Sequence, residues 1–141
     1  MMKLLFVALL FSTACHASVT YIGDSIAHGY KIANNGQGIT KIGASPRSVL
    51  NMLEISDPAD TLVLSTGASN DCGDIDQINQ NIDFAISKFK MVYVMDAPHC
   101  PTKVRTDIFQ KCTGGRCTVL YFVPGKDGTH PRSYNKLELM P

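Results

Sequence analysis

A serine that could act as a nucleophile follows a short apolar run near the start of the chain. The run Val19–Ile22 predicts a strand, Gly23-Asp24-Ser25 predicts a tight turn, and the residues after Ser25 predict a helix. Such a turn holds the serine hydroxyl beside the N-terminus of the helix, where unpaired N–H groups favour negative charge. The alternative is an ordinary turn, because Gly, Asp and Ser are all common turn residues.

A nucleophilic serine needs a base, and His130 is the best candidate among the histidines. It lies in the sequence Asp127-Gly128-Thr129-His130-Pro131. A carboxylate three residues earlier can accept a hydrogen bond from Nδ1–H, which leaves Nε2 free to take the serine proton. The alternative is that this segment is only a turn with an exposed histidine. His28 has no obvious orienting acid, and His99 is interpreted as part of a loop; both are expected to be structural.

Two further residues could stabilise a developing oxyanion. Gly43 follows the predicted strand 38–42, and Asn70 follows the predicted strand Thr61–Ser65. The backbone N–H groups of Ser25 and Gly43 and the amide of Asn70 could each donate a hydrogen bond, typically lowering a barrier by about 3 kcal/mol. For Asn70 the alternative is a polar turn or a helix cap.

Strands alternate with helices along the whole chain, which predicts an α/β domain with three layers and a mainly parallel sheet. In such a sheet the carboxyl ends of the strands share one edge, so the four candidate segments are expected to converge there. The predicted strands are residues 19–22, 38–42, 61–65, 91–95 and 118–123. The predicted helices cover residues 25–33, a segment beginning at Pro46, residues 75–89, a turn or two after Pro98, and Arg132–Leu137.

Four short blocks of the sequence resemble, in their order along the chain, those of the SGNH (GDSL-type) hydrolase superfamily. They are Gly23-Asp24-Ser25, Gly43, Asn70-Asp71 and Asp127-x-x-His130. The resemblance covers essentially the whole chain after the leader described below. It implies a flavodoxin-like α/β/α sandwich and ester hydrolysis through an acyl-serine intermediate, with no metal and no cofactor.

The resemblance also implies a role for each residue. Ser25 would be the nucleophile and the first oxyanion donor, Gly43 the second donor and Asn70 the third. His130 would be the general base, oriented by Asp127.

Two features depart from the family pattern. The third block usually reads Gly-x-Asn-Asp, whereas here Gly67 stands one place early and Ala68 occupies the glycine position. The chain also continues for only eleven residues after His130, which leaves little room for a lid. An open cleft is therefore expected.

The first seventeen residues predict a secretory signal peptide, which leaves residues 18–141 as the SGNH-like domain. Lys3 precedes the apolar run Leu4–Phe11, and small residues follow up to Ala17, the expected cleavage point. The alternative is a lipoprotein acylated at Cys15. No other stretch of the sequence is long and apolar enough to cross a membrane. The mature protein is therefore expected to be exported.

Four cysteines remain after the predicted cleavage, an even number that suits disulfides in an exported protein. Cys112 and Cys117 flank a turn-like sequence that can bring them together, which leaves Cys72 to pair with Cys100. The alternative is four reduced thiols.

Composition excludes some classes of partner. The 141 residues carry a net charge of +1 and are 45% hydrophobic, which suits one globular domain. No basic stripe is present, so a nucleic acid is not expected as a partner. The expected substrate is a small ester or an O-acetylated carbohydrate of the cell envelope, hydrolysed by a monomer. The alternatives are a lysophospholipase or thioesterase, or a catalytically idle domain that binds a glycan or an envelope protein.

Overall fold

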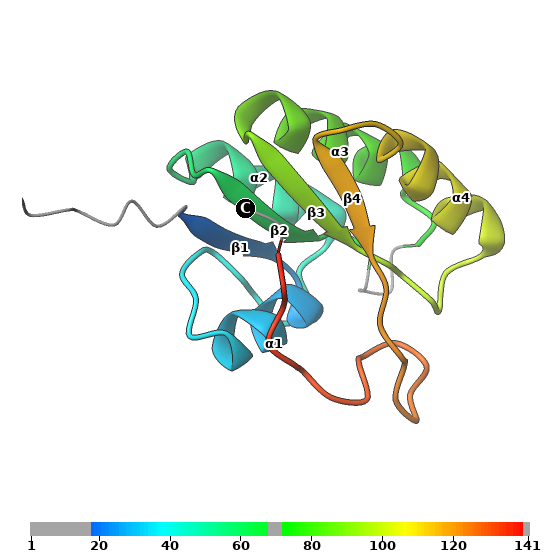
Figure 1. Ribbon diagram of the computed structural model, residues 1–141. Coiled ribbons are helices and arrows are strands. Elements are labelled where there is room, and N and C mark those ends of the chain that lie inside the picture. Colours follow the sequence, from blue (N-terminus) through cyan, green and yellow to red (C-terminus); the bar gives the residue numbers. More distant parts are fainter. Residues whose placement is uncertain (1–17, 68–71, 140–141) are drawn as a thin grey trace, which may run out of the picture.

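The computed structural model describes residues 18–67 and 72–139 (Figure 1). The predicted signal peptide 1–17, Cys15 and Asn70 lie outside the described residues. The elements follow in the order β1 (Val19–Gly23), α1 (Ser25–Ala33), α2 (Pro46–Ile55), β2 (Thr61–Ser65), α3 (Ile75–Lys88), β3 (Met91–Met95), α4 (Thr102–Lys111) and β4 (Cys117–Leu120).

The four strands form one parallel sheet in the order β1-β2-β3-β4. Helices α2, α3 and α4 cover one face of this sheet, and α1 lies on the other face with the C-terminal segment (Figure 1). The predicted α/β architecture is therefore confirmed, and it is compatible with a three-layer sandwich. Because all strands are parallel, β1 to β4 end at the same edge.

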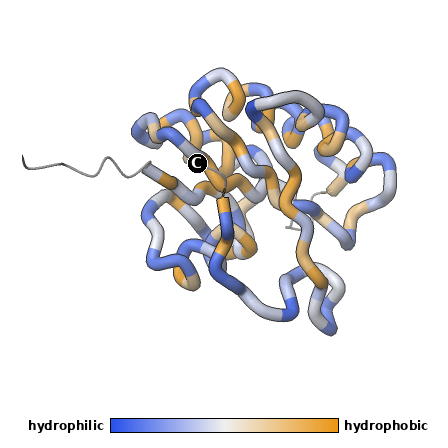
Figure 2. The backbone as a smooth tube through the Cα atoms, viewed as in Figure 1, coloured by the Kyte–Doolittle hydropathy of each residue, from blue (hydrophilic) through white to orange (hydrophobic). Residues whose placement is uncertain are grey.

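The central strands β2 and β3 are buried on both faces, which explains why they read as nearly continuous apolar runs. Alternate strand residues belong to two clusters. Leu62 and Leu64 pack with the cluster under α2, α3 and α4, while Val63 packs with the cluster under α1. In Figure 2, hydrophobic residues run along the strands through the centre of the molecule, and hydrophilic residues gather in the loops and outer helices.

The predicted strand 38–42 is wrong, because this segment makes only isolated bridges along the outer edge of β1. Thr20 bridges Gln37 and Gly23 bridges Thr40, both in parallel. Gly38 has a positive φ of 131°, and a Cβ at that position would lie 1.9 Å from the carbonyl oxygen of Tyr21. The close approach at glycine interrupts regular pairing, although the segment still occupies the place of a further strand.

The predicted helix Arg132–Leu137 is also wrong, since the segment is irregular. Its backbone N–H and carbonyl groups form hydrogen bonds with other parts of the chain instead of with one another. The N–H of Arg132 donates to the carbonyl of Val123 over 2.8 Å. The side chain of Asn34, at the end of α1, accepts from Leu137 N–H over 2.8 Å and donates to the carbonyl of Asn135 over 3.3 Å. Strand β4 likewise ends at Leu120 instead of Val123, because its partner β3 ends at Met95.

Both disulfides have the predicted pairing. Cys72 and Cys100 are joined across a Cα–Cα distance of 5.6 Å, which ties the segment before α3 to the segment after β3. Cys112 and Cys117, 4.6 Å apart, join the end of α4 to the start of β4. Two disulfides suit an oxidising compartment. Among the described residues, none of the helices combines the length and apolar character that crossing a membrane requires.

Replacing Asn34 by Ala is expected to reduce the free energy of unfolding by about 1–2 kcal/mol, because the hydrogen bonds to the C-terminal segment are lost. Chemical denaturation measures this change. Asn135→Ala is the matched control, since Asn135 accepts from Asn34 only through its backbone carbonyl. Equal destabilisation by the two substitutions would show that Asn34 does not fasten the segment.

Candidate active site

The turn between β1 and α1 holds Ser25 at the end of the strand. Asp24 caps the helix and is completely buried. Its Oδ1 accepts from the backbone N–H of Ile26 over 3.1 Å and from the hydroxyl of Ser65 over 2.7 Å. These two bonds fix the turn to the end of β2, so the first residue of α1 is held in one position.

Gly23 is required by the same turn. Its φ is +138°, and a Cβ there would lie 2.0 Å from the carbonyl oxygen of Ser65. No side chain fits that space, so Gly23 permits the close approach of β1 to β2. The buried Asp24–Ser65 bond was not predicted from the sequence. The only signal for it was an acidic residue directly before a predicted helix.

The side chains of Ser25, His130 and Asp127 form a continuous hydrogen-bonded chain. The Ser25 hydroxyl lies 2.7 Å from Nε2 of His130. Nδ1 of the same ring lies 2.6 Å from Oδ2 of Asp127. A carboxylate only accepts, so Nδ1 carries the proton and Nε2 accepts from the serine hydroxyl. The unprotonated Nε2 of His130 is therefore placed to accept the proton of the Ser25 hydroxyl.

Asp127 is fixed by its own turn. Its Oδ1 accepts from the backbone N–H groups of Thr129 and His130, each over 2.9 Å. The hydrogen bond from the His130 side chain, with these two backbone bonds, lowers the pKa of the Asp127 carboxyl to about 2. The carboxylate is therefore ionised at neutral pH and keeps the imidazole in one tautomer and one orientation.

The loop carrying these two residues closes on itself. The N–H of Gly125 donates to the carbonyl of His130 over 2.7 Å, and Pro124 and Pro131 form an antiparallel bridge. The loop borders an open hollow of about 720 Å³, lined in part by Lys126, Asp127 and His130.

Tyr134 connects this loop to the helix that carries Ser25. Its ring lies against Gly29, where a Cβ would come within 2.2 Å of Tyr134 Cε1. The same ring meets Tyr30 edge-on, with centroids 5.0 Å apart. Ser25 and Gly29 are one turn apart on α1, so Tyr134 positions the His130 loop directly beside the serine. Tyr134 and Gly29 were missed at the level of sequence, because no local pattern links them.

The structure describes two of the three predicted oxyanion donors, Ser25 and Gly43. Gly43 lies in a turn closed by a bond from Ala44 N–H to the Lys41 carbonyl, with a φ of +76° and open space around its Cα. Within the described part of the chain its N–H makes no hydrogen bond, so it can donate to a ligand. Ser25 is the first helical residue, and its N–H has no intrahelical partner. Asn70 lies outside the described residues, and its role stays a prediction.

The other histidines have structural neighbours. Nδ1 of His28 lies 2.9 Å from the hydroxyl of Thr40 and ties α1 to the segment beside β1. His99 lies beside the disulfide, with Nε2 3.5 Å from Sγ of Cys100. Cys72, His99 and Cys100 are close enough to hold a metal ion, but the two sulfur atoms are bonded to each other here. In this oxidised state the cluster offers no thiolate ligand.

Replacing His130 by Gln is expected to raise the pKa of the Asp127 carboxyl toward its ordinary value, because the largest cause of its lowering is the His130 side chain. Because the pKa of Asp127 is lower in the folded protein, its ionised carboxylate stabilises the loop at pH values above the ordinary pKa of an aspartate. This contribution to stability disappears as the pH falls toward about 2. Carbon-13 NMR of the carboxyl group measures the midpoint. An unchanged midpoint in the variant would mean that His130 does not hold the carboxylate.

Replacing Tyr134 by Ala is expected to weaken the hydrogen bond between Ser25 and His130, because the loop loses its support on α1. Tyr134→Phe keeps the ring and should preserve the bond, so it is the matched control. The nitrogen-15 shift of His130 Nε2, compared with that in Ser25→Ala, reports the bond directly. A native shift in Tyr134→Ala would contradict the positioning role.

The described residues thus place a serine, a histidine and a carboxylate in one hydrogen-bonded chain at the N-terminus of α1. The chain matches no protein-family model and no curated protein. What the site does is therefore inferred from its geometry.

Proposed function

We propose that the protein is an exported serine esterase of the SGNH type, which hydrolyses short-chain acyl esters through an acyl-serine intermediate. The observation that supports this proposal most directly is the hydrogen-bonded chain from Ser25 through His130 to Asp127. A serine hydroxyl is a weak nucleophile until an adjacent base takes its proton. Here the base is in contact and its tautomer is fixed.

In the first half of the reaction, Ser25 Oγ attacks the carbonyl carbon of the ester while Nε2 of His130 takes the hydroxyl proton. The N–H groups of Ser25 and Gly43 donate to the oxyanion of the tetrahedral intermediate. The imidazolium then gives its proton to the leaving alkoxide. An acyl-serine and a free alcohol result, and the Asp127 carboxylate stabilises the imidazolium between these steps.

In the second half, a water molecule replaces the alcohol. His130 takes one proton from the water as its oxygen attacks the acyl carbon, and the same proton returns to Ser25 Oγ as the acid leaves. Asn70, the third predicted donor, would contribute to the same oxyanion. Because the base must be neutral, activity is expected to fall as the pH is lowered and the imidazole becomes protonated.

The proposed substrates are short acyl esters on accessible carbohydrate, acetyl esters above all. Ser25 and His130 are only half-buried, which supports access of a polymer to the site. The two disulfides support action outside the cytoplasm. The predicted signal peptide 1–17 would direct the export.

Ser25→Ala and His130→Ala are each expected to lower kcat for a chromogenic acetate ester by about 1000-fold or more, because both residues act in one proton transfer. Ser87→Ala is the matched control, since Ser87 is exposed on α3, across the sheet from α1, and its hydroxyl donates only to the Phe84 carbonyl. Hydrolysis by the mature protein and its variants is followed by absorbance. Native turnover by either site variant would refute the assignment.

A fluorophosphonate probe separates the proposed esterase from an idle binding domain. The probe forms a covalent bond to an activated serine, so the esterase should be labelled and Ser25→Ala should not. Absence of labelling in the native protein would favour the idle domain.

A further inference from the structure

A second hollow lies beside the C-terminal segment. It has a volume of about 570 Å³, within the usual range for a small-molecule site. In Figure 1 the chain after β4 and the red C-terminal segment diverge on this side of the sheet. One part of the lining is apolar, mostly aromatic, and the other is polar. The apolar residues are Tyr30, Tyr121, Phe122, Val123 and Leu137, and the polar residues are Arg132, Ser133 and Asn135.

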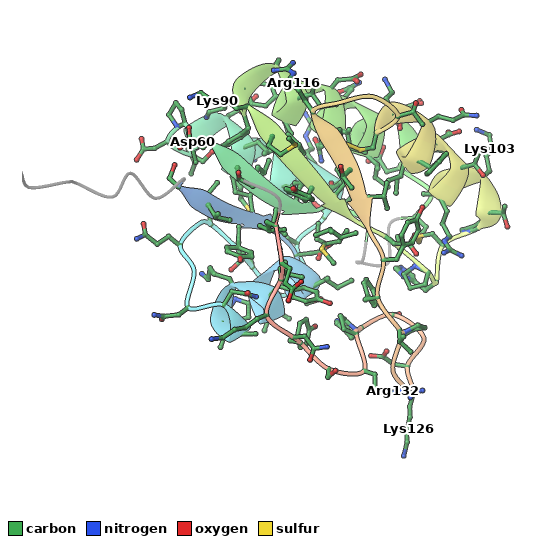
Figure 3. All side chains as sticks on the ribbon, viewed as in Figure 1. Asp60, Lys90, Lys103, Arg116, Lys126 and Arg132 are labelled. Carbon is green, nitrogen blue, oxygen red and sulfur yellow. A yellow bond between two sulfur atoms is a disulfide. The ribbon has the colours of Figure 1, made fainter. Side chains whose placement is uncertain are left out.

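Arg132 lines both this hollow and the one beside His130. It follows His130 by two residues, a chain span of at most about 7 Å. Figure 3 shows Arg132 and Lys126 projecting from the same loop. Among the described residues, the guanidinium of Arg132 makes no hydrogen bond or ion pair. An exposed guanidinium without a partner is suited to bind a carboxylate or phosphate through two parallel hydrogen bonds.

The mixed lining restricts the kind of ligand. An aliphatic acyl chain could pack against the apolar residues, but it would offer no hydrogen-bonding partner to Arg132, Ser133 and Asn135. A sugar ring has apolar C–H groups for the aromatic residues and hydroxyl groups for the polar residues. A negative charge on that ring would pair with Arg132.

We infer that this hollow is a subsite for a carboxylate-bearing sugar unit, held by Arg132 next to the ester that Ser25 attacks. The inference rests on the proposed function, because it names the class of carbohydrate that this site takes. The acyl group would be carried by the same sugar unit or by its neighbour, since Arg132 and His130 are close in the chain.

Binding tests the subsite without requiring hydrolysis. Methyl glucuronoside and the neutral methyl glucoside are titrated into the mature protein, and amide shifts are followed by NMR. The glucuronoside is expected to bind about tenfold more tightly and to shift residues 121–123 and 132–135. Arg132→Gln should abolish the difference. Arg116→Gln is the matched control, because Arg116 lies at the opposite end of the molecule (Figure 3).

Equal affinities for the two sugars, or shifts confined to other surfaces, would overturn the inference. Glucose 6-phosphate distinguishes the source of the charge. Tighter binding of this phosphate than of the glucuronoside would assign the subsite to phosphorylated sugars and would overturn the inference that its ligand carries a carboxylate.

Hydrolysis separates this inference from the proposed function. An O-acetylated methyl glucuronoside and its neutral methyl ester are compared by kcat/KM for acetate release. The acid is expected to be favoured about tenfold in the native protein, and the ratio should approach one in Arg132→Gln. If the native protein hydrolyses the acid and the neutral methyl ester with equal kcat/KM, the subsite is overturned and the esterase is not. Charge-dependent binding together with no hydrolysis of either this substrate or the chromogenic acetate ester would refute the esterase and leave the subsite.

Discussion

The close approach of β1 to β2 is the constraint on which the candidate site depends. It is possible only because Gly23 has no side chain to meet the Ser65 carbonyl. The buried carboxyl of Asp24 then joins the two strand ends through Ser65 and the first turn of α1. Ser25 takes its position from this junction. In the proposed reaction, a serine on a freely moving loop would have to be ordered during catalysis, whereas this junction would hold Ser25 in position beforehand.

The second constraint concerns the face of the sheet that α1 covers. Three helices cover the opposite face, whereas this face is covered by α1 together with the irregular C-terminal segment (Figure 1). That segment is fastened by the Asn34 side chain and by the Tyr134 ring. The same contacts that complete the core therefore place His130 beside Ser25, so packing and the geometry of the site are connected.

The sequence allowed much of this arrangement to be predicted. Apolar runs and helical spacing located β1, β2 and β3 because buried parallel strands and amphipathic helices have strong local signals. The Asp127–His130 pairing was predictable since both residues lie in one turn. The edge segment 38–42 and the last helix were predicted wrongly, because close backbone contact at Gly38 and side-chain bonds from Asn34 overrode local preference. Tyr134 against Gly29 is a contact between distant segments that no periodicity reveals.

The Ser25–His130 contact joins residues 105 positions apart, whereas Asp127 and His130 are separated by three. Contacts within one turn cost little chain entropy to form, and a contact that closes most of the chain costs more. The Asp127–His130 pair is therefore a local unit that can exist early in folding. The bond to Ser25 exists only when the sheet, α1 and the C-terminal segment are all in place. Opening of that segment alone would separate the imidazole of His130 from the hydroxyl of Ser25 while the sheet stays folded.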